Sequence, residues 1–160
     1  MKKLLPILLL SVFYYSCQNE CDNLECHNGF CSESTPPECI CDQWWEGDKY
    51  NRETRHAYLG GWLVNSNCSD VNYYFFNITR GSDVNEIIIT SQQFNGAISI
   101  IAERPINGTL ISDTEVSITD FRIRDTNYSG NLEMTETGML MTINVQTESE
   151  TTICEYHFEQ

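Results

Sequence analysis

Apolar and polar residues alternate in short stretches from Tyr58 to the C-terminus, and this pattern predicts strands rather than helices. The expected strands cover residues 61–67, 72–79, 86–91, 97–103, 108–112, 115–122, 128–134, 139–147 and 151–158. Turn-forming pairs such as Asn107-Gly108 separate them. Short strands at spacings of roughly 8 to 12 residues predict an all-β domain over residues 58–160. Its expected architecture is an antiparallel meander β-barrel, with a β-sandwich as the alternative.

In two of these strands the alternation of apolar and polar residues shifts by one position, which we call a slip. The apolar positions change from even numbers, ending at Ile118, to odd numbers, starting at Phe121, and this predicts a β-bulge near residues 119–120. A similar slip is expected between Ile153 and Tyr156.

Three runs of neighbouring apolar residues also stand out. Residues 87–89 and 98–101 are continuously apolar, which predicts strands buried on both faces or at the centre of a sheet. The run Tyr73–Phe76 places aromatic rings on both faces of one strand. We expect these rings to serve core packing and a cross-strand ladder, with a ligand-stacking face as the alternative.

The N-terminus has the features of an export signal. Residues 1–3 are basic at two positions, and residues 4–15 form an apolar run too short to span a bilayer. The pair Ser16-Cys17 resembles the bacterial lipobox, although Tyr14 stands where that motif usually has leucine. The resemblance implies a signal peptide over residues 1–16 and lipid attachment at Cys17, with residues 17–20 as a tether. The expected location is then the outer membrane or cell surface, and a soluble secreted protein is the alternative.

Cysteines are concentrated in the next segment. Dense cysteines in an exported chain predict a disulfide framework, and no pair has zinc-ribbon spacing. The segment Cys26–Cys31, which reads CHNGFC, resembles the C-x-N-G-x-C motif of EGF-like modules, and a C-x-C pair ending at Cys41 follows it. We therefore expect an EGF-like module over residues 21–50 and a linker over residues 51–57.

The EGF-like resemblance implies two disulfides, Cys21 to Cys31 and Cys26 to Cys39. The sixth cysteine of the family should fall near position 50, where this chain has a tyrosine, so Cys41 is expected to be a free thiol or to form an intermolecular bridge. The remaining cysteines, Cys68 and Cys154, lie on the first and last strands of the β domain. Those strands are neighbours in a closed barrel, so a bridge between them is expected. If Cys17 is not lipidated, eight cysteines could instead close four bridges.

Gly60-Gly61-Trp62 resembles the G-x-W start of lipocalin-like calycin barrels. As a whole, residues 17–160 resemble a recurrent kind of small Gram-negative lipoprotein, in which an EGF-like module precedes a β domain. That resemblance implies no known activity.

The excess of acidic over basic side chains limits the kinds of molecule that this chain can bind. The chain has 23 acidic and 9 basic side chains, and Lys2 and Lys3 lie within the expected signal peptide, so residues 17–160 carry a formal charge of −16. Such a chain has no broad basic surface, and a nucleic-acid partner is excluded on this ground. We find no hydrolase elbow, metalloprotease pair, P-loop or dinucleotide fingerprint, and His27, His56 and His157 are isolated. Neither a metal nor a cofactor is expected.

These features predict a non-enzymatic, membrane-anchored protein that recognises an unknown protein or glycan partner. The alternative is a carrier whose barrel encloses a small apolar ligand. Bulky inward-facing residues such as Trp62, Phe75 and Ile89 favour a filled core over a carrier. Trp44 and Trp45 are expected to pack against the disulfides or the β domain, although a sticky binding surface is the other interpretation.

Overall fold

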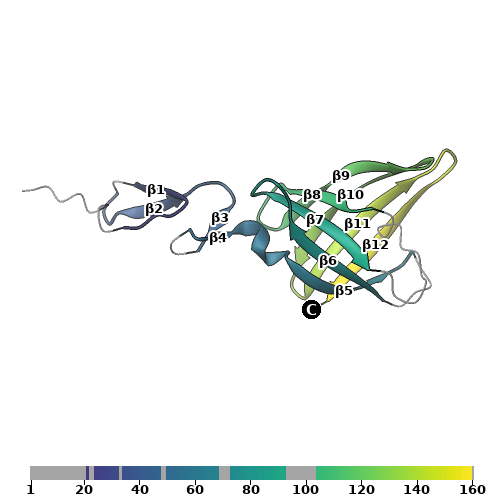
Figure 1. The fold of residues 1–160 in the computed structure, drawn as a ribbon, viewed down its shortest axis with the longest axis horizontal. Helices are drawn as coiled ribbons and strands as arrows, with labels where there is room; N and C mark the ends of the chain where they lie inside the picture. The colour runs from purple at the N-terminus through teal and green to yellow at the C-terminus, as the bar shows by residue number, and fades with distance from the viewer. Residues whose placement is uncertain are drawn as a thin grey trace, which may run out of the picture.

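The fold is an eight-stranded closed antiparallel barrel preceded by a small disulfide-linked module (Figure 1). The computed structural model describes residues 21, 24–32, 34–47, 50–68, 73–92 and 104–159. The barrel strands are β5 (Gly60–Ser66), β6 (Tyr74–Arg80), β7 (Glu86–Gln92), β8 (Ile106–Leu110), β9 (Glu115–Ile123), β10 (Thr126–Thr135), β11 (Gly138–Gln146) and β12 (Thr151–Glu159).

Each strand pairs with its neighbour in the chain, and β12 pairs with β5 to close the barrel. The closing register places Tyr156 opposite Ser66 and Glu159 opposite Leu63. The all-β fold class and the meander barrel are therefore confirmed, and the alternative β-sandwich is wrong. The predicted strand over residues 97–103, with its apolar run 98–101, lies outside the described residues.

Alternating side chains fill the inside of the barrel, as the period-two pattern predicted. On β11, Met139, Met141 and Ile143 are buried while the residues between them are partly exposed. Aromatic rings contribute much of the interior: Phe76 and Phe158 have ring centroids 5.5 Å apart, and Trp62 lies 6.3 Å from Phe158. The core is thus formed by the inward faces of the strands.

The β-bulge expected near residues 119–120 is confirmed. Strand β9 pairs Phe121 with Tyr128 and Ile118 with Gly130, so two residues of β9 oppose the single residue Ser129 of β10. The slip expected on the last strand is wrong, since β12 pairs with β11 without interruption. Cys154 takes the inward position there.

Ile153, in contrast, is 55 % exposed on the outer face of β12. The sequence pattern counted Ile153 as an inward position because it is apolar, and this produced the apparent change in the alternation on β12.

Among the aromatic run, Tyr74 and Phe76 are buried in the core, and Tyr73 is exposed. Phe75 was expected among the inward-facing bulky residues, but it lies on the outer face, where its ring covers the backbone of Gly61. A Cβ atom at Gly61 would lie 2.5 Å from the Phe75 ring.

The N-terminal module consists of two short hairpins. Strand β1 (Gly29–Ser32) pairs with β2 (Glu38–Cys41), and β3 (Trp45–Glu46) pairs with β4 (Arg52–Glu53). Tyr50, at the position of the expected sixth cysteine, is tied to the first hairpin: its hydroxyl donates a hydrogen bond to the Cys39 carbonyl, and its own carbonyl accepts one of 2.9 Å from Asn28. Hydrogen bonds therefore hold the segment that a third disulfide would otherwise fasten.

The polar segment expected to be a linker is part of the fold. After β4, the 3-10 helix η2 (Thr54–Ala57) leads directly into the barrel, and Thr54 and Arg55 are each only 5 % exposed. Trp44 of the module packs against the barrel core, as expected for this ring, and its carbonyl accepts a hydrogen bond of 2.9 Å from the Thr54 amide. The module and the barrel are thus joined by a packed contact rather than by an extended linker.

Candidate binding site on the outer face of the barrel

The disulfides join the cysteines that the sequence led us to pair. Cα–Cα distances are 5.8 Å for Cys21–Cys31, 5.7 Å for Cys26–Cys39 and 5.3 Å for Cys68–Cys154. The last bridge ties the segment just after β5 to β12, next to the seam where the barrel closes. All six cysteines therefore have structural roles, and none of them contributes to a site.

Cys41 is a free cysteine in the structure and is half-buried at the end of β2. Burial, and next the negative charge of Asp42, raise the pKa of its thiol. A raised pKa lowers the fraction of reactive thiolate at neutral pH, so this thiol lacks the activation that a nucleophile requires. Cys17, the expected lipid attachment residue, lies outside the described residues.

A guanidinium is buried where the module meets the barrel. Arg55 Nη1 donates to the backbone carbonyls of Gly81, Asp83 and Glu86, which belong to the β6–β7 turn region. The Glu53 carboxylate accepts hydrogen bonds of 2.9 Å from both Arg55 Nε and Arg80 Nε. These bonds fix the turn against η2, so the network is a structural latch.

The bond from Arg55, supported by that from Arg80, lowers the pKa of Glu53 to about 2, against the opposing effect of burial. Glu53 and Arg55 both fall within the expected linker over residues 51–57, because an arginine in a polar segment gives no periodic signal of burial.

The interior of the barrel is occupied by its own side chains. Tyr58, at the end that η2 closes, is fully buried; its hydroxyl donates to the Asp113 carbonyl, and its own carbonyl accepts a hydrogen bond of 3.0 Å from Trp62 Nε1. The bulky buried residues within the barrel include Trp62, Tyr74, Phe76, Ile78, Ile87, Ile89, Leu132, Met141, Tyr156 and Phe158. In the part of the barrel that the structure describes, these buried side chains fill the interior, as expected for an eight-stranded barrel without a ligand cavity.

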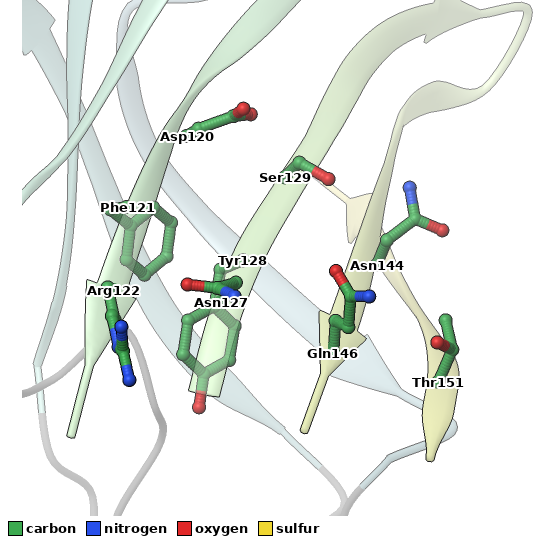
Figure 2. Close-up of a pocket in the computed structure, with 9 residues that line it drawn as sticks. All are labelled: Asp120, Phe121, Arg122, Asn127, Tyr128, Ser129, Asn144, Gln146 and Thr151. Atoms are coloured by element: carbon green, nitrogen blue, oxygen red, sulfur yellow. The ribbon is translucent and has the colours of Figure 1, made fainter. Parts of the chain in front are cut away.

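A hollow of about 530 Å³ lies over strands β9 to β12, toward the β9–β10 and β11–β12 turns (Figure 2). It is lined by Asp120, Phe121, Arg122, Asn127, Tyr128, Ser129, Asn144, Gln146 and Thr151. Asn144 and Gln146 face outward because they alternate with the inward Ile143 and Val145. The hollow is therefore formed mainly by the outer face of the barrel.

The registers arrange these outward side chains in rows across the strands. Arg122 is opposite Asn127, Asn127 is opposite Gln146, and Gln146 is opposite Thr151, so four polar residues form one row. A second row, two residues further along, pairs Ser129 with Asn144. With strands about 4.8 Å apart, the first row is roughly 14 Å long.

Aromatic rings form part of the wall of this hollow. Phe121 and Tyr128 stack with centroids 4.9 Å apart and planes inclined by 11°. Both rings are largely buried, so they support the hollow rather than present a free stacking surface. The bulge on β9 places Asp120 beside them as an exposed residue.

Two other kinds of feature, metal-ligand clusters and membrane-spanning helices, also bear on what the described residues can do. In the described parts of the chain, no group of three or more histidine, cysteine, aspartate or glutamate side chains could hold a metal ion. None of the helices described here is long and apolar enough to cross a membrane. The polar side chains in the hollow can donate and accept hydrogen bonds.

No known protein family, curated protein or solved structure shows a significant match to this chain.

Proposed function

We propose that this chain is an exported, lipid-anchored, non-enzymatic protein that presents the outer face of β9 to β12 as a recognition surface. The proposal rests mainly on the filled interior of the described part of the barrel. If the interior has no room for a ligand, a binding partner has to contact the outer surface. The carrier hypothesis loses its support for the same reason.

The position of the hollow suits a protein held at its N-terminus. The proposed anchor residue, Cys17, precedes the module, and the module packs against the end of the barrel that η2 closes. The β9–β10 and β11–β12 turns lie at the other end of the barrel (Figure 1). The lining residues of the hollow come from the parts of β9 to β12 next to these turns. The module then acts as a spacer that holds the recognition surface away from the membrane.

The proposed anchor follows from the physical chemistry of acylation. Each buried CH₂ contributes about 0.8 kcal/mol to membrane binding, so two or more acyl chains on Cys17 would hold the protein stably on a bilayer. The strongly negative charge of residues 17–160 disfavours direct adhesion to anionic lipid, so the acyl chains would supply the attachment.

The test is to locate the protein in its own cells. Intact cells are incubated with a membrane-impermeant antibody against the barrel, and membrane and soluble fractions are compared for the wild type and Cys17→Ser. We expect the wild type to be labelled on intact cells and to fractionate with membranes, and the variant to leave the membrane fraction. A wild-type protein found in the culture medium, or one labelled only after lysis, would contradict the proposal.

A further inference from the structure

The hollow over β9 to β12 concentrates neutral hydrogen-bonding groups that the protein itself does not use. Within the described residues, the side chains of Asp120, Asn127, Ser129, Asn144, Gln146 and Thr151 form no hydrogen bond with another part of the chain. Two carboxamides elsewhere on the surface are engaged: the Asn131 side chain donates to Glu133, and the Asn67 side chain accepts from the Glu155 amide. The groups in the hollow are available to a ligand.

The types of these groups indicate the chemistry of the ligand. A carboxamide offers two donors and an acceptor, and a hydroxyl both donates and accepts. Three carboxamides and two hydroxyls from β10, β11 and β12 therefore present donors and acceptors side by side. A ligand that matches this mixture must itself alternate donors and acceptors over a comparable length, as the neighbouring hydroxyl groups of a sugar chain do.

The charges around the hollow disfavour an anionic ligand. Arg122 is the cation among its lining residues, and its guanidinium already donates to the Arg124 carbonyl and to the Asp125 carboxylate. Asp120 lines the hollow, and Glu150 directly precedes Thr151 in the chain. A second cation, Arg104, lies near the hollow with its guanidinium over the Phe121 ring, 5.3 Å from the centroid. Phosphate or sulfate groups are mainly acceptors, so they would leave the donor–acceptor mixture of the carboxamides and hydroxyls only partly matched, and the ligand is expected to be uncharged.

The same residues also argue against a protein as the primary partner. The residues that dominate protein–protein binding are commonly tryptophan, tyrosine and arginine seated in desolvated pockets. Here the Tyr128 ring is largely buried and Arg122 is paired within its own turn, so neither is free to act as such an anchor. The accessible side chains that remain in the hollow carry mainly amide and hydroxyl groups.

We infer that this hollow binds a neutral oligosaccharide, with the Asn127–Gln146–Thr151 row and the Ser129–Asn144 pair as its hydrogen-bonding subsites. This inference rests on the proposed function, since it names the ligand class of the same surface. The row of four polar residues fits an extended chain of sugars lying across the strands, in contact with several side chains at once.

The test uses the mature protein purified in mild detergent and two panels of immobilised oligosaccharides. The neutral panel contains oligomers of glucose, mannose, galactose and N-acetylglucosamine, and the anionic panel contains sulfated and uronic-acid oligomers. The variants are Asn144→Ala and Gln146→Ala. The matched control is Asn65→Ala, which removes an outward-facing carboxamide from β5, outside the hollow.

We expect the wild type to bind at least one neutral oligosaccharide and each hollow variant to weaken this binding by about fivefold or more, since a lost hydrogen bond has roughly this effect. The control should bind like the wild type, and all variants should retain the wild-type unfolding midpoint. Binding to anionic probes alone, to neither panel, or with equal loss in Asn65→Ala would overturn the inference. Surface labelling of intact cells is independent of these results, so failure of the glycan inference and failure of the proposed function are distinguishable.

Discussion

The Oε2 atom of Glu53 lies 2.9 Å from Nε of Arg55, and this ion pair is located where the module enters the barrel. The Arg55 side chain is 6 % exposed and that of Glu53 is 19 % exposed. Arg55 also supplies hydrogen bonds to three carbonyls of the β6–β7 turn region. One side chain thus connects the β4–η2 segment to the barrel.

Replacing Arg55 with alanine should destabilise the protein by about 3 kcal/mol, because three carbonyls lose this donor and the largely buried Glu53 carboxylate keeps only its bond from Arg80. Urea unfolding followed by tryptophan fluorescence measures this loss. The control is Arg52→Ala, which breaks the exposed Arg52–Glu46 pair and should change the free energy of unfolding by less than about 1 kcal/mol. Equal effects of the two variants would show that the latch has no special role.

The same pair predicts a pH dependence. The pKa of Glu53 is lowered to about 2 in the folded state from an ordinary value of 4.5, so the folded state favours the ionised carboxylate. The resulting stabilisation is fully present above the ordinary pKa and is lost as the pH falls toward about 2. The difference in unfolding free energy between wild type and Glu53→Gln should therefore narrow as the medium is acidified. A constant difference from neutral to acid pH would contradict this assignment.

Removal of the Cys68–Cys154 disulfide should have a large effect. Its cysteines are 86 residues apart, and a crosslink closing such a loop contributes about 4 to 5 kcal/mol in the chain-entropy model. The double variant Cys68→Ala with Cys154→Ala should lower the unfolding free energy by up to this amount. Cys41→Ser, which removes a free thiol, serves as the control and should leave stability near the wild-type value. A double variant as stable as this control would show that barrel closure does not depend on the bridge.

Gly130 of β10 lies opposite Ile143 of β11. A Cβ atom at this position would lie 2.0 Å from the Thr142 carbonyl oxygen and 3.0 Å from the Ile143 Cδ1 atom. Gly130→Ala should therefore force the strands apart and cost about 1 to 3 kcal/mol, as overpacking does. Ser129→Ala, one residue away and outward-facing, should cost much less. Thermal unfolding of the two variants provides the comparison.

The barrel could be predicted because its strands are amphipathic with period two. Alternation on β11 predicted its boundaries to within one residue and its inward face, and the change of phase between Ile118 and Phe121 identified the bulge. The prediction failed where an apolar residue faces outward, as at the exposed Ile153 and the half-buried Phe75. A pattern read along one strand cannot distinguish an apolar residue that faces solvent from one that faces the core.

The latch and the hollow could not be predicted for a different reason. The carbonyls that Arg55 contacts lie 26 to 31 residues further along the chain, and nothing in the local sequence marks them. The polar residues of the hollow come from four strands, and each of them is an ordinary outward position when taken alone. Only the registers that place Asn127 opposite Gln146 and Ser129 opposite Asn144 bring them together.

The most direct test of the whole account is the intact mass of the protein isolated from its own cells in mild detergent, recorded natively and then after denaturation with thiol alkylation. We predict a chain that begins at Cys17 and carries acyl groups, one alkylated thiol from Cys41, and no apolar ligand retained inside the barrel. An unmodified N-terminus without a free thiol, or a small apolar molecule that is present only in the native spectrum, would contradict the account.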